Sequence, residues 1–153
     1  DQSELDLEYQ AQMDKFLATG LQPDHIDFHV CTTPKQLKAA MKLAQKYNLP
    51  MRAQTQEIEA ILAQNGIRYA PCHIPDFYDH GTVEMLLELL NRSLKEQRES
   101  VEFALHPAYV DQTLLELSSY NIQRAKELAT LMDPRVMAFI QEHSIEFIHF
   151  GNI

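Results

Sequence analysis

The chain of 153 residues contains no tryptophan, only four glycines and only two cysteines. Four glycines make a glycine-rich phosphate-binding loop improbable, which argues against a nucleotide-binding protein. The sequence also contains neither GxSxG nor HExxH, so serine-hydrolase and zincin mechanisms are disfavoured. Cys31 and Cys72 lie far apart without a CxxC pattern. We therefore expect free thiols in a reducing compartment rather than a disulfide framework.

Basic residues are also scarce, because 13 Lys and Arg face 22 Asp and Glu for a formal net charge of −9. This balance argues against nucleic acid as a partner, since binding a phosphate backbone needs clustered positive charge. No run of about 18 apolar residues occurs, so neither a membrane span nor a membrane partner is expected. The first residues are acidic and amphipathic, unlike a signal peptide, and a cytoplasmic protein is expected. The size and composition favour one domain over residues 1–153 with a real core.

Helical and strand patterns alternate at short spacing along the chain. Apolar residues at helical spacing predict helices near 5–17, 34–47, 55–64, 82–94, 121–131 and 134–142, with a short helix within 109–120. Strands are expected at 25–30, 51–53, 67–70, 100–105 and 145–150. This order is typical of an α/β fold with a mainly parallel sheet. In such folds the site lies at the carboxyl ends of the strands, where His29, Arg52 and His106 fall.

His25, Asp27 and His29 are spaced by two within the first predicted strand. Side chains alternate faces along a strand, so these three polar groups should share one face. Two imidazoles and a carboxylate on one face are suited to a metal site or to acid/base chemistry. The alternative is a strand end with solvated histidines, because alternating polar residues are common on exposed sheet faces.

Two further candidates follow predicted strands. His106 precedes Pro107, which restricts the exit from the strand and holds the imidazole at its tip. A histidine there is suited to general acid catalysis, although a simple strand-terminating turn explains it equally well. Arg52 has the fork geometry that binds a carboxylate or a phosphate, or else it is an ordinary surface arginine.

The longest irregular segment, residues 71–81, is the remaining candidate region. It contains Asp76, Tyr78, Asp79 and His80, and polar groups beside aromatic rings suit a sugar ligand. Long loops in α/β folds often contain functional residues. The same composition is also ordinary for any exposed loop.

At these residues the chain resembles the YdjC-like carbohydrate deacetylase family, which includes chitooligosaccharide deacetylases. Residues 24–29 (Asp-His-Ile-Asp-Phe-His) resemble the family's Thr-His-Ile/Leu-Asp-Ser-His. Residues 101–111 (Val-Glu-Phe-Ala-Leu-His-Pro-Ala-Tyr-Val-Asp) resemble its Glu-Leu-Met-Cys-His-Pro-Gly-Tyr-Val-Asp. Segments 7–12, 20–23, 48–52 and 117–121 also fit in order, so the resemblance covers nearly the whole chain.

The resemblance implies a partial or variant (β/α) barrel of the kind found in polysaccharide deacetylases. It also implies hydrolysis of N-acetyl groups on chitooligosaccharides or related amino sugars, with or without a phosphate group. The implied cofactor is a divalent metal, Mg²⁺ or Zn²⁺, that polarises the amide carbonyl and activates water.

The resemblance also implies a role for several individual residues. His29 matches a metal ligand, and the flanking His25 and Asp27 match further ligand, second-layer or acid/base groups. His106 corresponds to a candidate general acid for the leaving amine. Arg52, Asp76 and Tyr109 are the expected substrate-binding residues.

The sequence departs from the family pattern in two ways. The family's further histidines after residue 29 are replaced by a shortened Val-Cys-Thr-Thr-Pro segment. The family's amino-terminal half, with an Asp-Asp-Phe-Gly strand end and a second ligand histidine, does not occur in this chain. We therefore expect a carboxyl-terminal portion of a deacetylase that supplies only part of a metal site, because such sites normally need three or more ligands.

The alternative hypothesis is a non-catalytic barrel fragment or divergent paralogue that binds a carbohydrate or a partner subunit. The gene upstream of residue 1 separates the two, because an in-frame Asp-Asp-Phe-Gly strand favours the enzyme. An open barrel leaves strand edges unpaired, so we expect the chain alone to form a homodimer or to be poorly stable.

Overall fold

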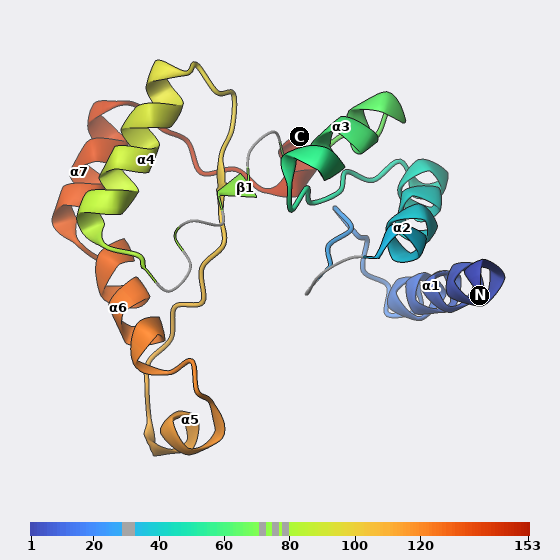
Figure 1. Cartoon of the computed structure of the whole chain (residues 1–153), viewed down its shortest axis with the longest axis horizontal. Helices are drawn as coiled ribbons and strands as arrows, with labels where there is room; N and C mark the ends of the chain where they lie inside the picture. The colour runs from blue at the N-terminus through green and yellow to red at the C-terminus, as the bar shows by residue number, and fades with distance from the viewer. Residues whose placement is uncertain (29–32, 71–72, 75–76, 78–79) are drawn as a thin grey trace. The chain divides into compact units, whose positions relative to one another are not determined.

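The computed structural model describes residues 1–28, 33–70, 73–74, 77 and 80–153. The helices among these residues are α1 (Gln2–Leu17), α2 (Pro34–Tyr47), α3 (Gln56–Gln64), α4 (Val83–Lys95), α5 (Gln112–Leu117), α6 (Ile122–Leu131) and α7 (Pro134–Glu142). Two short strands, β1 (His73–Ile74) and β2 (Glu102–Phe103), and the 3-10 helix η2 (Phe150–Asn152) complete the elements (Figure 1). The chain divides into two compact units, residues 1–71 with 148–153 and residues 72–147.

The predicted helices are confirmed, and side-chain caps account for where they begin. At the start of each of the seven described α-helices a side-chain oxygen accepts a backbone N–H from within the first turn, satisfying a group that the helix leaves unbonded. Two of these helices also have proline at their first position, where no N–H is needed. The caps are Asp1, Thr33, Thr55, Thr82, Asp111, Asn121 and Asp133.

Extended segments of the first unit run parallel to one another. The Ile26 N–H donates to the Pro50 carbonyl at 2.9 Å, and the Arg52 N–H donates to the Ile26 carbonyl at 3.0 Å. The Met51 N–H in turn donates to the Arg68 carbonyl at 2.9 Å. Parallel bridges therefore join Ile26 to Met51 and Met51 to Tyr69. The three predicted segments pair in the expected direction, but only as single bridges.

The core of the first unit lies between these extended segments and the helices α2 and α3. Its buried members are Leu37, Ala40, Ala44, Met51, Ala53, Leu62 and Ile67. Ile26 and Phe28 pack against this cluster, so the apolar face of the first predicted strand is covered as the alternation requires. Helix α1 packs along α2, where Gln10 Nε2 donates to the Tyr47 hydroxyl at 2.8 Å.

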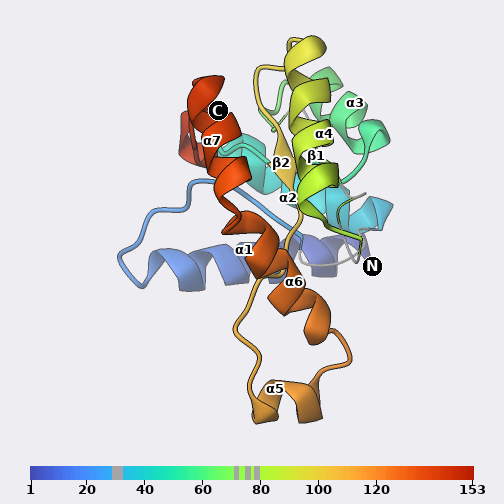
Figure 2. The same ribbon diagram turned by 90° about the vertical axis from the view of Figure 1, so that its left-hand side faces the viewer.

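The second unit is organised around α4. Its buried residues are Phe77, Val83, Leu86, Leu89, Leu90 and Val136. Helices α4 and α7 lie side by side in both views, while α5 stands away from them (Figures 1 and 2). Strands β1 and β2 pair in parallel, with His73 opposite Glu102 and Ile74 opposite Phe103.

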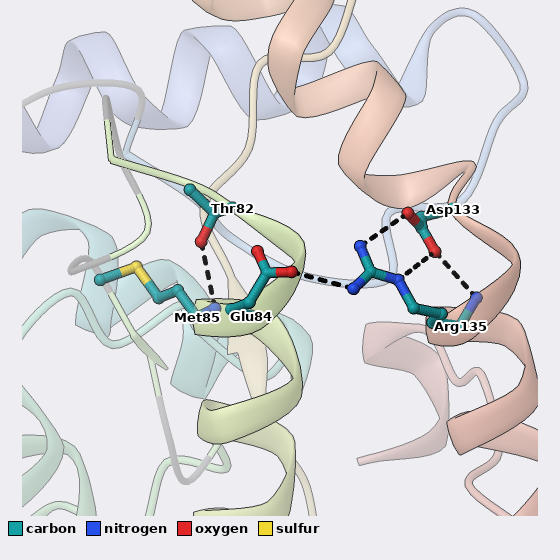
Figure 3. Close-up of polar contacts among 5 residues, drawn as sticks. All are labelled: Thr82, Glu84, Met85, Asp133 and Arg135. Atoms are coloured by element: carbon teal, nitrogen blue, oxygen red, sulfur yellow. Dashed lines mark hydrogen bonds and ion pairs between the residues drawn. The ribbon is translucent and has the colours of Figure 1, made fainter.

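An ion network joins α4 to α7 at the surface (Figure 3). Arg135 Nη1 donates to Glu84 at 2.9 Å, and its Nε donates to Asp133 at 3.0 Å. Hydrogen bonds from Arg135 hold the pKa of Asp133 below its usual range. The pKa of Glu84 is lowered first by its own backbone N–H at the helix start and then by Arg135.

The described residues are mostly helical with little sheet, and the strand pairs among them are parallel. The strand predicted at 145–150 is wrong, because Phe150 begins the 3-10 helix η2 and His149 caps it. Phe147 and Ile148, which the alternation assigned to opposite faces of a strand, are both exposed, so no apolar face is buried there. Among the described helices, none is both long and apolar enough to cross a membrane.

Candidate functional site

His25 and Asp24 form a pair at the start of the first extended segment. His25 Nδ1 lies 2.6 Å from Asp24 Oδ1, and the ring of His25 stacks on Phe150 at 4.2 Å between centroids. His149 Nδ1 lies 3.5 Å from the second oxygen of Asp24. The hydrogen bond from His25 is the main reason that the pKa of Asp24 is lowered.

Asp27 and Arg52 form an ion pair close to Phe150. Arg52 Nη1 lies 2.6 Å from Asp27 Oδ2, and the two side chains are 31% and 29% exposed. The Arg52 guanidinium carbon lies 5.7 Å from the centroid of the Phe150 ring, on which His25 also stacks. Phe150 therefore contacts both His25 and Arg52, and Arg52 in turn pairs with Asp27.

A hollow of about 760 Å³ lies beside these residues in the first unit. Of the residues just described, Asp24, His25 and Asp27 line it. The other lining residues are polar, aromatic and apolar: Gln12, Gln22, Gln36, Tyr9, Phe16, Phe28, Met13, Pro23, Ile26 and Leu43. Hollows of about 300–1,000 Å³ are the usual size of small-ligand sites. Carboxylates, amides and aromatic faces are also the groups that bind the hydroxyls and the apolar ring faces of a sugar.

His106 lies in the second unit, three residues after β2. Its N–H donates to Glu127 Oε2 at 2.5 Å, and its carbonyl accepts from Arg124 Nη1 at 3.3 Å. The imidazole is half-buried and meets the Tyr120 ring edge-on, with centroids 5.8 Å apart. Helix α6 therefore holds the backbone of His106 on both sides.

Sequence reasoning missed the residues that surround these histidines. Phe150 lies in a segment predicted as a strand, and its contact with His25 spans the length of the chain. Glu127 resembles an ordinary helix-surface charge in sequence, yet it is 2% exposed. The one local feature in the sequence that points to their joint role is the spacing of Arg124 and Glu127, which lie three residues apart and therefore on one face of a helix.

The remaining predicted residues are placed as follows. Tyr109 is 91% exposed, as a residue that meets ligand from solvent can be. His29 and Asp76 lie outside the described residues, as do Tyr78 and Asp79, and His80 is exposed. Within the described ranges no three His, Cys, Asp or Glu side chains gather into a group that could hold a metal ion. The predicted metal site stays a prediction.

The comparison with protein families decides the affiliation of the chain. The model of the YdjC-like protein family matches residues 1–142. The chain belongs to the YdjC-like family.

YdjC-like relatives named carbohydrate deacetylase occur in several bacteria. The protein from Clostridium beijerinckii is 35% identical over 153 residues, covering 96% of this chain and 60% of the relative. That from Geobacillus stearothermophilus is 33% identical over 150 residues, covering 96% of this chain and 58% of the relative. This chain therefore spans about three-fifths of the length of its curated relatives.

A solved structure supports the fold. The crystal structure of a "putative cellobiose-phosphate cleavage protein" from Enterococcus faecalis matches with a TM-score of 0.83 at 30% identity. The match covers 99% of this chain and 61% of that chain.

Proposed function

We propose that this chain is part of a metal-dependent hydrolase that removes N-acetyl groups from chitooligosaccharides or related amino sugars, with or without a phosphate group. The observation that carries the proposal is the polar cluster of His25, Asp27 and Arg52 beside a sugar-sized hollow. The chain also belongs to a family in which similar proteins are named carbohydrate deacetylase. The proposed fold of the complete protein is a (β/α) barrel, which the parallel pairing of the extended segments supports.

Each residue has a proposed role. His106 protonates the leaving amine. Its imidazole is half-buried, and its backbone N–H is held by Glu127, which suits a positioned general acid. Asp27 acts as an acid/base group whose carboxylate is oriented by Arg52. Arg52, Asp76 and Tyr109 bind the sugar, and the exposed ring of Tyr109 is suited to stacking on a sugar face.

A divalent cation, Mg²⁺ or Zn²⁺, is the proposed cofactor, and when bound it would polarise the amide carbonyl and lower the pKa of water. His29 and His25 are the proposed ligands from this chain. His25 fits such a role, because a ligand histidine normally bonds a carboxylate through its other ring nitrogen, as His25 does with Asp24. The described residues do not bring three potential ligands together, so the proposal completes the site with His29 and with ligands that lie outside the described residues.

A second candidate function is a non-catalytic module that binds a carbohydrate or a partner subunit. The observation in its favour is that the described residues bring no three potential metal ligands together. The hollow, with its polar, aromatic and apolar lining residues, is suited to binding as well as to catalysis. The two candidates therefore differ in turnover rather than in affinity for sugar.

The deciding experiment measures acetate release from N,N′-diacetylchitobiose by the complete protein that contains this chain. The wild type is compared with His29→Ala and with His143→Ala, an exposed histidine at the end of α7 that serves as the matched control. We expect chelation and His29→Ala each to abolish acetate release, and His143→Ala to retain it. Acetate release that survives both chelation and His29→Ala refutes the metal dependence, whereas sugar binding without any acetate release by the wild type refutes the deacetylase and favours the binding module.

A further inference from the structure

Glu127 is a buried carboxylate with no role in the chemistry described so far. It lies on α6 and is only 2% exposed. A buried carboxylate is costly unless hydrogen bonds compensate for the water it loses. The partners of Glu127 therefore indicate why the fold keeps it there.

Both oxygens of Glu127 accept hydrogen bonds from groups at the His106 end of this unit. Oε2 accepts the backbone N–H of His106 at 2.5 Å, and Oε1 accepts the hydroxyl of Tyr120. Tyr120 is the ring that the His106 imidazole meets edge-on. One carboxylate therefore holds both the main chain of His106 and the aromatic wall beside its side chain.

Arg124, one turn earlier on α6, holds the other side of His106. Its Nη1 donates to the His106 carbonyl at 3.3 Å, and its Nε donates to the Tyr120 carbonyl at 2.7 Å. Its guanidinium carbon lies 5.5 Å from the centroid of the Tyr120 ring. The N–H and the carbonyl of His106 are thus both bonded by side chains that lie on one face of α6.

This arrangement restricts the backbone from which the imidazole projects. The next residue, Pro107, has a fixed φ and no N–H, so it cannot offer a competing donor. Residues that hold a reacting group from behind contribute by limiting its positions, and a displacement of about 1 Å can cost a hundredfold in rate.

We propose that Glu127 and Arg124 are positioning residues that set the orientation of the His106 imidazole for proton transfer. The inference rests on the proposed function, which assigns His106 as general acid. It goes further by naming the helix that sets the geometry of that acid. A purely structural role for the pair, in which it only joins α6 to the segment after β2, is the competing explanation.

The experiment compares Glu127→Gln with Glu116→Gln in the complete protein labelled with ¹⁵N-histidine. Glu116 lies exposed on α5 of the same unit and bonds Gln112 at 2.8 Å, so it is a matched control away from His106. The backbone and ring signals of His106 are assigned by their loss in His106→Asn. Arg124→Gln is the second variant, so the inference remains testable if Glu127→Gln does not fold.

We expect amide exchange at His106 to quicken by about tenfold to a hundredfold in Glu127→Gln, the range for losing a hydrogen bond to a charged acceptor. The ring titration of His106 should shift, and kcat for acetate release should fall by about tenfold or more with KM unchanged. Arg124→Gln should act in the same direction, and Glu116→Gln should match the wild type.

Two results overturn different parts of the account. Unchanged His106 signals and unchanged kcat in folded Glu127→Gln and Arg124→Gln overturn the positioning pair. The positioning role is also overturned if activity falls only in proportion to the amount of folded protein while the titration of His106 is unchanged. A purely structural role predicts that result. Full acetate release by His106→Asn overturns the proposed role of His106 itself.

Discussion

Replacing Arg52 by glutamine separates two interactions that the structure assigns to one side chain. Arg52 pairs with Asp27 at 2.6 Å, and its guanidinium lies 5.7 Å from the Phe150 ring centroid. Both partners of the ion pair are about a third exposed, so the pair resembles the surface pairs that contribute about 0.2–1 kcal/mol. A cation over an exposed aromatic ring adds about 0.5–1 kcal/mol.

These magnitudes predict an order among the variants. Asp27→Asn removes only the ion pair and should cost about 0.5–1 kcal/mol in free energy of unfolding. Arg52→Gln removes both interactions and should cost about 1–2 kcal/mol. The double variant should cost no more than Arg52→Gln alone, which gives a coupling energy of about 0.5–1 kcal/mol between the two residues.

Urea denaturation followed by circular dichroism measures each free energy, and Glu57→Gln on the exposed face of α3 serves as the control. Raising the salt concentration should reduce the coupling, because the pair is partly solvated. Costs that simply add in the double variant, to within about 0.3 kcal/mol, would show that Asp27 and Arg52 do not interact.

Two further predictions concern stability. Leu62→Ala leaves a cavity at a fully buried position and should lower the free energy of unfolding by about 2–5 kcal/mol. Leu117→Ala, at a residue 82% exposed, should change it by no more than about 0.5 kcal/mol. Equal losses of stability in thermal or urea unfolding would contradict the described core. Hydrogen bonds from Arg135 lower the pKa of Asp133, and Arg135 adds to the backbone N–H that is the main reason for the lowered pKa of Glu84. The stabilisation from Arg135 is therefore present above the unfolded pKa values of the two carboxyl groups and is lost as the pH falls through the folded values. Wild type should therefore lose more stability than Arg135→Gln between about pH 5 and pH 3, and parallel pH profiles would count against the network.

The helices could be predicted from sequence because their determinants are local. Thr33 with Pro34, and Asp133 with Pro134, mark helix starts within three residues of chain, and the structure has the helices there. Strands depend on partners elsewhere in the chain. The predicted segments at 25–30 and 51–53 therefore appear as single parallel bridges, and the one at 145–150 ends in a 3-10 helix.

The candidate site likewise has parts that depend on local sequence and parts that depend on distant contacts. That His25 and Asp27 share a face follows from the period of a strand, and the structure links the two residues through Phe150, on which His25 stacks, and Arg52, which lies over the same ring and pairs with Asp27. That Phe150 would supply the surface on which His25 stacks could not be predicted, because the contact joins opposite ends of the chain. Glu127 was missed for a related reason, since burial of a helix charge depends on the segment packed against it.

The most direct test of the central claim is the rate of acetate release from N,N′-diacetylchitobiose by the complete protein carrying His106→Asn, with His143→Asn as the matched control. General acid catalysis contributes about a hundredfold or more, so kcat should fall by at least that factor in His106→Asn and stay near wild type in His143→Asn. A His106→Asn variant that releases acetate at the wild-type rate contradicts the account.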